Sequence, residues 1–172
     1  MHGLIDAELL GRLLDELGPP LTLYAAQWTD AADDCVQEAL VELAGQPRVP
    51  DNLRAWLYRV VKHRALNAAR GARRRRDRET RAATGRLAAA DESAAFDRWD
   101  AITVVEALDR LESAEREVVV MRIWGSLTYK EIAIAISIST STAHRHFERA
   151  LEKLRHVLES PCSTNKNPAS SS

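Results

Sequence analysis

The chain has 172 residues, which is enough for one ordinary domain or two small ones. Hydrophobic residues at 45% and charged residues at 28% are close to the averages of soluble globular proteins and exclude collagen-like, low-complexity or wholly disordered chains. No apolar run approaches the ~20 residues of a membrane span, and Met1 to Glu16 is too acidic and too interrupted for a signal peptide. We therefore expect a cytoplasmic protein without membrane insertion.

The net charge of -1 conceals four segments of alternating sign. Residues 1–52 carry 2 basic and 10 acidic side chains, whereas residues 53–81 carry 11 basic and 2 acidic ones. Residues 82–117 carry 4 basic and 9 acidic side chains, and residues 118–172 carry 7 and 4. Two basic blocks, each preceded by an acidic one, predict two surfaces that face a polyanion.

Apolar residues recur at spacings of three and four along most of the chain, which predicts an all-α protein. The first amphipathic helix is expected to stop at Gly18-Pro19-Pro20, with a second one from Pro20 through Trp28. Asp30 is a candidate cap for the next helix, which should end at Gly45. Two prolines predict a loop over residues 47–52.

A long helix is predicted from Leu53, with one apolar stripe and basic residues over the rest of its surface. Its basic end, from Arg73 to Arg76, is followed by a stretch poor in large apolar residues, which we interpret as a linker over residues 77–100. A second helical set begins near Ala101 and includes a helix from Ser113 to Ile123. The predicted domains are therefore 1–76 and 101–158, followed by a disordered tail over 159–172.

Residues 127–150 read as helix, turn, helix. Thr128 and Glu131 have the spacing of a capping box, and Ser139 with Thr142 can open the second helix. The second helix carries His144, Arg145 and Arg149, and such a helix can enter a DNA major groove. An ordinary pair of packed core helices is the alternative interpretation.

Metal and redox sites find little support. His144 and His146 are two residues apart and so lie on different helix faces. Cys35 and Cys162 are the only cysteines, which support neither a disulfide framework nor a four-ligand zinc site. We predict no bound metal and no cofactor.

Two stretches resemble regions of bacterial RNA polymerase sigma factors of the extracytoplasmic-function (ECF) group. The run from Ala107 to Arg155, with Arg-Glu-Val-Val-Val-Met-Arg and Leu-Thr-Tyr-Lys-Glu-Ile-Ala, resembles region four. Ala32-Asp33-Asp34-Cys35-Val36-Gln37-Glu38-Ala39, followed by Leu53-Arg54-Ala55-Trp56-Leu57-Tyr58-Arg59-Val60, resembles region two. The two matches occur in the order of that family and cover most of residues 20 to 156. Regions one and three have no counterpart, as in the small two-domain group.

The resemblance implies an all-α fold of two small helical domains joined by a flexible linker, the C-terminal one a helix-turn-helix. It implies a sigma factor that binds core RNA polymerase, recognises promoter DNA and promotes transcription initiation, and that is not an enzyme. An anti-sigma factor is a further candidate partner. The acidic helix would bind core polymerase through Asp33, Asp34, Val36, Gln37 and Glu38. The acids of this helix also suit any helix N-terminus, and both roles can hold at once.

The resemblance also implies two sets of DNA contacts. The minus-ten element would meet Asn52, Trp56, Tyr58, Arg59, Asn67, Arg73, Arg74, Arg75 and Arg76. A tryptophan in the place of Trp56 is more often a core residue than a base contact, and the arginines also suit a solvated helix end. The minus-thirty-five element would meet Thr140, Ser141, Thr142, His144, Arg145 and Arg149. The family's usual glycine in the turn is Ser137 here, and Ala143-His144-Arg145-His146 replaces the usual Val-Lys-Ser-Arg, so the promoter sequence cannot be carried over.

Two other functions fit parts of the sequence. A helix-turn-helix transcription regulator that is not a polymerase subunit would explain residues 101–158 but not the match at residues 32–76. A nucleic-acid hydrolase could hold a divalent metal with Asp33, Asp34 and Glu38. Of these, Asp34 and Glu38 share a helix face at i and i+4, but no third ligand joins them there and no further acidic cluster is evident.

Overall fold

The computed structural model of the chain describes residues 5–82 and 106–159. Within these residues the helices are α1 (Ala7–Ala25), α2 (Ala32–Ala44), α3 (Leu53–Ala82), α5 (Ser113–Ile123), α6 (Tyr129–Ile136) and α7 (Thr140–Glu159). A short helical segment at residues 106–109 precedes α5. The described residues contain no β-strand, and the predicted all-α fold is confirmed.

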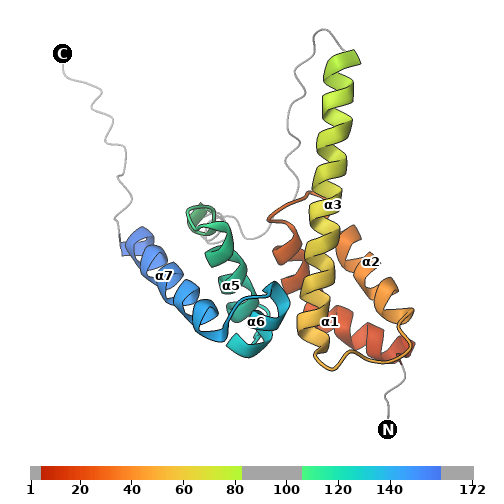
Figure 1. Cartoon of the computed structure of the whole chain (residues 1–172), viewed down its shortest axis with the longest axis horizontal. Coiled ribbons are helices and arrows are strands. Elements are labelled where there is room, and N and C mark those ends of the chain that lie inside the picture. The colour runs from red at the N-terminus through yellow and green to blue at the C-terminus, as the bar shows by residue number, and fades with distance from the viewer. Residues whose placement is uncertain (1–4, 83–105, 160–172) are drawn as a thin grey trace, which may run out of the picture.

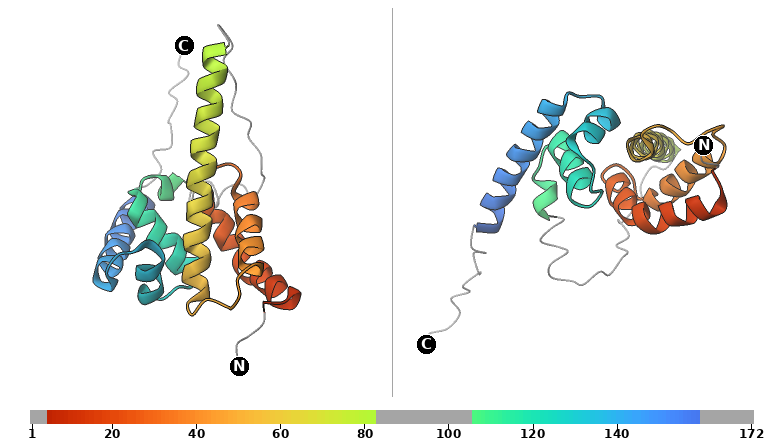
Figure 2. Two further views of the ribbon diagram at one scale, coloured as in Figure 1. Left: turned by 45° about the vertical axis from the view of Figure 1, so that its right-hand side comes forward. Right: turned by 90° about the horizontal axis from the view of Figure 1, so that it is seen from below.

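The helices form two units that lie side by side (Figures 1 and 2). The N-terminal unit comprises α1, α2 and α3, and the C-terminal unit comprises α5, α6 and α7. Helix α3 continues through Ala82 and so occupies the first part of the stretch predicted as a linker over 77–100. The remainder of that stretch lies outside the described residues, as does the predicted tail beyond Glu159.

Helix α1 runs without interruption through Gly18-Pro19-Pro20, so the predicted stop at this tripeptide is wrong. The two prolines lack the N–H groups that would bond the carbonyls of Asp15 and Glu16. Both of these residues are exposed, so water can satisfy the freed carbonyls. Gly18 and Pro20 themselves are buried, and the burial of this face offsets the lost hydrogen bonds.

Helix α2 agrees with the prediction at its C-terminal end but not at its N-cap. Helix α2 ends at Ala44, with Gly45 as its C-cap, as the sequence predicts. Its N-cap is Ala31 without a side-chain hydrogen bond, so the predicted cap at Asp30 is wrong. The Thr29 hydroxyl accepts from the Ala31 amide at 3.2 Å instead.

The N-terminal unit buries the apolar face of α3 against α1 and α2. Leu57, Val61 and Ala65 are fully buried at the spacing that the sequence predicts. Tyr58 is also fully buried, although it lies outside the predicted stripe. Its ring packs edge-on against Tyr24 of α1, with centroids 4.9 Å apart. The inner face of α3 is therefore wider than the apolar pattern alone indicates.

The C-terminal unit is a helix-turn-helix built on α6 and α7. The predicted capping box is present, because the Thr128 amide donates to Glu131 Oε2 at 2.7 Å and the Glu131 amide donates to Thr128 Oγ1. The turn passes through Ser137 with φ at 58°, which is the left-handed conformation. Glycine, the usual residue at this position in the family that the sequence resembles, adopts this conformation without strain. Ser139 then accepts from the Thr142 amide at 3.0 Å and begins α7. The predicted elements of this motif are all found.

A buried ion pair joins α5 to α7. Glu115 is 1% exposed, and Lys153 Nζ donates to its carboxylate at 2.7 Å and 3.0 Å. Burial would raise the pKa of Glu115, but the hydrogen bonds from Lys153 and the Glu112 amide outweigh it and lower that pKa. The pair therefore holds α7 at a set position on α5.

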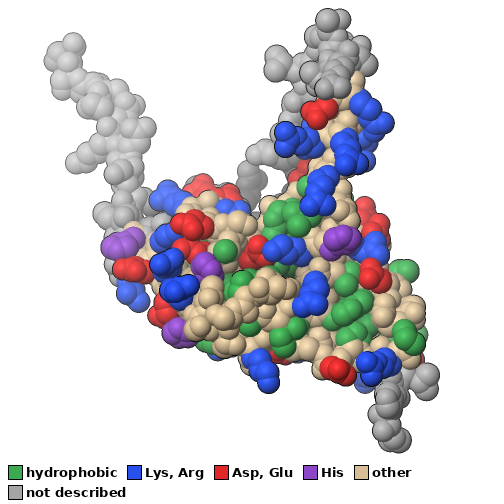
Figure 3. Space-filling model, in the orientation of Figure 1, with side chains coloured by type: hydrophobic (Ala, Val, Ile, Leu, Met, Phe, Trp, Pro, Cys, Tyr) green, Lys and Arg blue, Asp and Glu red, His purple; other side chains and the backbone are tan. Residues whose placement is uncertain are grey.

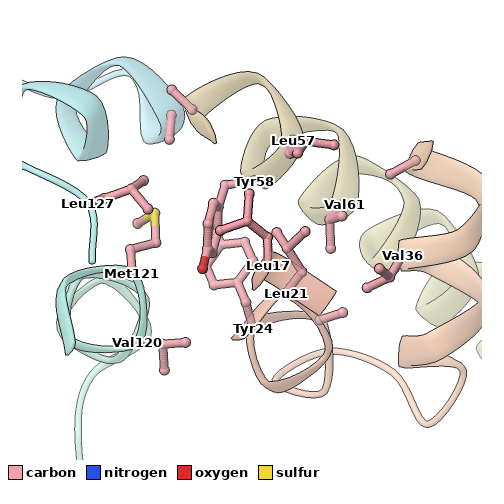
Figure 4. Packing of buried hydrophobic residues seen from close by; sticks show 14 of the residues in the cluster. Leu17, Leu21, Tyr24, Val36, Leu57, Tyr58, Val61, Val120, Met121 and Leu127 are labelled. Carbon is pink, nitrogen blue, oxygen red and sulfur yellow. The ribbon is translucent and has the colours of Figure 1, made fainter. Parts of the chain in front are cut away.

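The two units share one hydrophobic cluster. Val120, Met121 and Leu127 of the C-terminal unit face Tyr24 and Tyr58 of the N-terminal unit (Figure 4). Contacts run from α1 to α5 and from α3 to α6. The described residues thus form two helical units in direct contact.

Candidate protein and nucleic-acid interfaces

The acidic residues of α2 lie on an exposed surface beside a shallow groove. Asp34, Gln37 and Glu38 line this groove together with Val41, a large apolar side chain that is 73% exposed. The groove therefore combines carboxylates with an exposed aliphatic group, which suits a protein partner with a basic and apolar surface.

The other two residues predicted for this surface have structural contacts. Asp33 is exposed and accepts a hydrogen bond from the Thr22 hydroxyl of α1 at 2.9 Å. Val36 is 2% exposed and packs in the core. Of the predicted set, only Asp34, Gln37 and Glu38 line the groove.

Arg64 of α3 connects the groove to the basic helix. Its Nη1 donates to Glu38 at 2.5 Å and its Nη2 donates to Glu42 at 2.6 Å. The hydrogen bonds to Glu42 and Glu38 raise the pKa of Arg64 despite its partial burial. Arg64 therefore fixes the position of the Glu38 carboxylate, whereas Asp34 makes no ion pair or hydrogen bond within the described residues.

The residues predicted to contact the minus-ten element are distributed around α3. Trp56 and Tyr58 are two residues apart, which turns their side chains about 200° around the helix axis. Trp56 is half-buried, and Tyr58 is fully buried between the two units. Asn52 is half-buried and caps α3, since its Oδ1 accepts from the Ala55 amide at 3.1 Å. These residues do not form one surface in the described structure.

One outer side of α3 does gather polar groups. Asn67 lies about three turns after Trp56 and therefore on the same side of the helix. His63 and Asn67 are exposed, and their side chains are 3.3 Å apart, from His63 Nε2 to Asn67 Nδ2. Arg70 Nη1 donates to Asn67 Oδ1 at 2.9 Å. His63 and Arg70 were not singled out from the sequence, although helical periodicity from Trp56 would have found both.

The last turns of α3 form a basic arm, which we define as Arg73, Arg74, Arg75 and Arg76. The helix extends beyond the body of the N-terminal unit here (Figure 1). All four side chains are exposed, and Lys and Arg side chains gather over this part of α3 in the space-filling view (Figure 3). No hydrogen bond or ion pair of these four side chains occurs within the described part of the chain. The arm is therefore available to a polyanion.

Helix α7 presents the residues predicted for the minus-thirty-five element. Thr140, Ser141, His144, Arg145 and Arg149 are exposed, and Thr142 is half-buried. Arg145 and Arg149 are one turn apart, and neither makes an ion pair or hydrogen bond within residues 5–82 and 106–159. A helix with this exposed basic face can enter a major groove.

An aromatic cluster positions the start of α7 on α6. Tyr129 packs edge-on against His144 and Phe147, with centroids 5.0 Å and 5.9 Å away. The Arg122 guanidinium lies 4.9 Å from the centroid of the Tyr129 ring and donates to the Leu127 carbonyl at 2.9 Å. One side of His144 is thus held by protein contacts, whereas Arg145 is exposed and makes no hydrogen bond or ion pair within the described residues.

No group of three or more potential metal-ligating side chains occurs among the described residues. No helix in the same ranges is long and apolar enough to span a membrane.

An exposed basic helix in one unit, with an acidic groove and a second basic helix in the other, defines a two-part helical protein with a helix-turn-helix. Comparison with known families gives the class more closely. Residues 16–75 match the model of Sigma-70 region 2, and residues 107–156 match the model of Sigma-70, region 4. The chain belongs to the sigma-70 family, in its group of ECF RNA polymerase sigma factors.

Curated relatives carry the same group name. The chain is 30% identical over 134 residues to the ECF RNA polymerase sigma factor SigD of Mycobacterium tuberculosis, across 74% of this chain and 63% of that protein. It is 33% identical over 110 residues to the ECF RNA polymerase sigma factor SigK of Mycobacterium ulcerans, across 61% of this chain and 58% of that protein. The chain thus spans less than two thirds of the length of these relatives.

Solved structures share the fold. The sigma factor RpoE in complex with the anti-sigma factor NepR from Bartonella quintana aligns with a TM-score of 0.61 at 23% identity, across 91% of this chain and 99% of that one. CnrH in complex with the cytosolic domain of CnrY aligns with a TM-score of 0.56 at 22% identity, across 91% of each chain. At this identity the likeness concerns the fold alone.

Proposed function

We propose that this chain is a sigma factor that binds core RNA polymerase, recognises promoter DNA and promotes transcription initiation. The observation that carries the proposal is the combination, in one chain, of the acidic groove on α2 with two separate basic surfaces on α3 and α7. One surface suits a protein partner and two suit DNA, which is the set of contacts that a promoter-recognition subunit needs.

Each surface has its own role in this proposal. Asp34, Gln37 and Glu38 bind core polymerase. Asp33 and Val36 hold α2 in position, Asp33 through its hydrogen bond from Thr22 and Val36 through its packing in the core. The outer side of α3 and the basic arm bind the minus-ten element, and the exposed face of α7 binds the minus-thirty-five element. The chain has no catalytic role of its own and acts in the cytoplasm. An anti-sigma factor is a further proposed partner, since both solved neighbours are bound to another protein.

The alternative functions are less well supported. A regulator that acts without being a polymerase subunit needs only the helix-turn-helix and leaves the match to region 2 unexplained. A hydrolase needs a metal site, and Glu38 is instead bonded to Arg64, which would compete with a cation for its carboxylate.

Reconstitution tests the proposal directly. The purified chain is mixed with bacterial core RNA polymerase, and the complex is separated by size-exclusion chromatography. The assembled enzyme is then offered a library of duplexes with randomised promoter elements. We expect co-elution and selection of a sequence motif, whereas a folded chain that neither binds core polymerase nor confers selectivity would exclude a sigma factor.

Two arginines on α7 distinguish sequence reading from backbone positioning. Arg145 lies in the early turns of the recognition helix, where side chains reach base edges, and Arg149 lies one turn later. We expect Arg145→Ala to change which minus-thirty-five sequences are preferred, by about 1 to 3 kcal/mol at the contacted base pair. Arg149→Ala should weaken all sequences alike, because phosphate contacts carry no sequence information.

The two substitutions control for each other, since both remove an exposed arginine without an ion pair from the same helix. The randomised library provides the measurement for both variants. A changed preference with Arg149→Ala alone, or with neither variant, would mean that α7 does not sit in the groove as proposed.

A further inference from the structure

A second cleft lies between α2 and α3, which run side by side (Figure 1), and it adjoins the acidic groove. Both hollows are lined by Asp34, Glu38 and Arg64. The α2 wall of the cleft carries three carboxylates, which belong to Asp34, Glu38 and Glu42. Its α3 wall carries polar and basic side chains, which belong to His63, Arg64, Asn67 and Arg75. Part of the surface proposed for DNA therefore shares a cleft with a row of negative charges.

Such a row of carboxylates opposes the binding of a polyanion. A phosphate backbone that reaches Asn67 and Arg75 passes beside the α2 wall, where like charges repel it. Exposed charges act over about 10 Å at 0.1 M salt, so the repulsion extends from α2 to the helix packed beside it. Glu38 and Glu42 also repel each other, because they lie one turn apart on α2. Binding of DNA along α3 therefore requires that these carboxylates be neutralised.

Arg64 neutralises two of the three carboxylates at once. Its two terminal nitrogens donate separately, Nη1 to Glu38 at 2.5 Å and Nη2 to Glu42 at 2.6 Å. The planar guanidinium suits this task, because its donors are held in a fixed fork. The side chains of Glu38 and Glu42 are 59% and 39% exposed, and ion pairs so open to solvent contribute little to stability. The main effect of Arg64 is therefore on the charge of the cleft.

The neighbouring cations of α3 have other partners or none. Lys62 Nζ donates to the Glu117 carboxylate of α5 at 2.7 Å and 3.0 Å, and the Tyr24 hydroxyl donates to the same carboxylate at 2.8 Å. Arg75 lines the cleft but makes no ion pair within the described part of the chain. Among the described residues, Arg64 is thus the cation that pairs with the α2 wall.

We propose that Arg64 is a positioning residue for DNA binding, which neutralises Glu38 and Glu42 so that a phosphate backbone can pass along α3 without contacting Arg64 itself. The inference rests on the proposed function, which assigns this side of α3 to DNA. A direct contact between Arg64 and a phosphate is the competing explanation. The two explanations differ when Arg64 and Glu42 are removed together, because the cleft then keeps its net charge but lacks the guanidinium.

The test is the affinity of the full chain for a fluorescent DNA duplex of random sequence, measured by anisotropy over a range of salt concentrations. The parent for this test carries Arg145→Ala and Arg149→Ala, so that the signal reports mainly on α3. At low salt we expect Arg64→Met to bind the duplex about fivefold more weakly than this parent, with a difference that fades as salt screens the carboxylates. Arg64→Met combined with Glu42→Gln should bind as the parent does, because one charge of each sign is lost.

Arg12→Met is the matched control. Arg12 donates to Glu8 at 3.2 Å in an exposed ion pair of α1, outside the cleft, so its loss changes the net charge of the chain equally. We expect this control to bind the duplex as the parent does. If Arg64→Met does not fold by circular dichroism, Glu42→Gln alone still tests the proposal. It leaves Arg64 with one carboxylate fewer and should strengthen binding about fivefold at low salt.

Four results would overturn the role of Arg64. The first is a double variant as weak as Arg64→Met, with a salt slope lowered by about 0.9, which would identify a direct phosphate contact. The second is an Arg12→Met control as weak as Arg64→Met, which would reduce the effect to net charge. The third is an affinity that neither Arg64→Met nor Glu42→Gln changes. The fourth is a parent chain that binds no duplex, because α3 would then offer no polyanion surface.

A second measurement separates the role of Arg64 from the proposed function. Chains with intact α7 are assembled with core polymerase, and the affinity of each complex for a promoter from the randomised library is measured. We expect Arg64→Met to weaken the complex and the added Glu42→Gln to restore it. Failure to bind polymerase would overturn the proposed function, while the duplex affinities of the free chain would still decide the role of Arg64. A selective enzyme that Arg64→Met leaves unchanged would overturn that role alone.

Discussion

Reversing the charge of the α2 groove should lower the affinity for core RNA polymerase by about 3 kcal/mol, roughly a hundredfold, since opposed charges at an interface become like charges. The variant is Asp34→Arg combined with Glu38→Gln. Asp34 is exposed and makes no ion pair within the described residues, so its reversal leaves the fold intact. Glu38→Gln removes the charge while its amide oxygen can still accept from Arg64. The measurement is a fluorescence titration of the labelled chain with core polymerase.

The control carries the same change of charge on another helix of the same unit. Asp15→Arg with Glu8→Gln alters two exposed acids of α1, which lie away from the groove. We expect this control to bind core polymerase as the parent chain does, with equal helix content by circular dichroism. Equal affinities for both double variants and the parent chain would show that α2 does not contact the polymerase.

Replacing the basic arm, Arg73 to Arg76, by alanine should weaken promoter complexes strongly and make them less sensitive to salt. Each phosphate contact that is lost lowers the slope of log K against log salt by about 0.9, so four lost contacts lower it by about 3 to 4. Alanine has the highest helix propensity, so α3 should keep its helix. The measurement is the promoter affinity of the reconstituted enzyme at several salt concentrations.

Arg12→Ala with Arg48→Ala is the control for general charge. Both residues are exposed cations of the N-terminal unit outside the basic arm. We expect little change in slope from this pair. If replacing all four arginines by alanine leaves the slope of log K against log salt unchanged, the basic arm is only a solvated helix end.

The sequence by itself determined the helical class of the protein and the local structure of its helix-turn-helix. The recurrence of apolar residues at spacings of three and four is a local property of a helix, and the helices that it predicts are found as α2, α3, α5, α6 and α7. The capping box at Thr128 and Glu131 and the serine cap at Ser139 act within one turn of the chain. The exposed arginines of α7 follow from the same periodicity, because the side chains opposite the apolar positions must face solvent.

The continuity of α1 and the burial of two predicted site residues depend on tertiary structure, because both arise from contacts between residues that are distant in the sequence. The uninterrupted α1 depends on the burial of Gly18 and Pro20 by other helices, which outweighs the proline signal. Val36 and Tyr58 match positions of functional motifs, yet their exposure depends on neighbours that are distant in the sequence.

The contact between the two units is the largest such effect. Tyr24, Lys62 and Glu117 are separated by up to 93 residues along the chain, and none of them stands out in its own segment. Their hydrogen bonds depend on the apolar cluster that holds the two units together beside them. The pattern of a single helix shows which face is apolar but not which distant face covers it, and that choice belongs to the packing of the whole molecule.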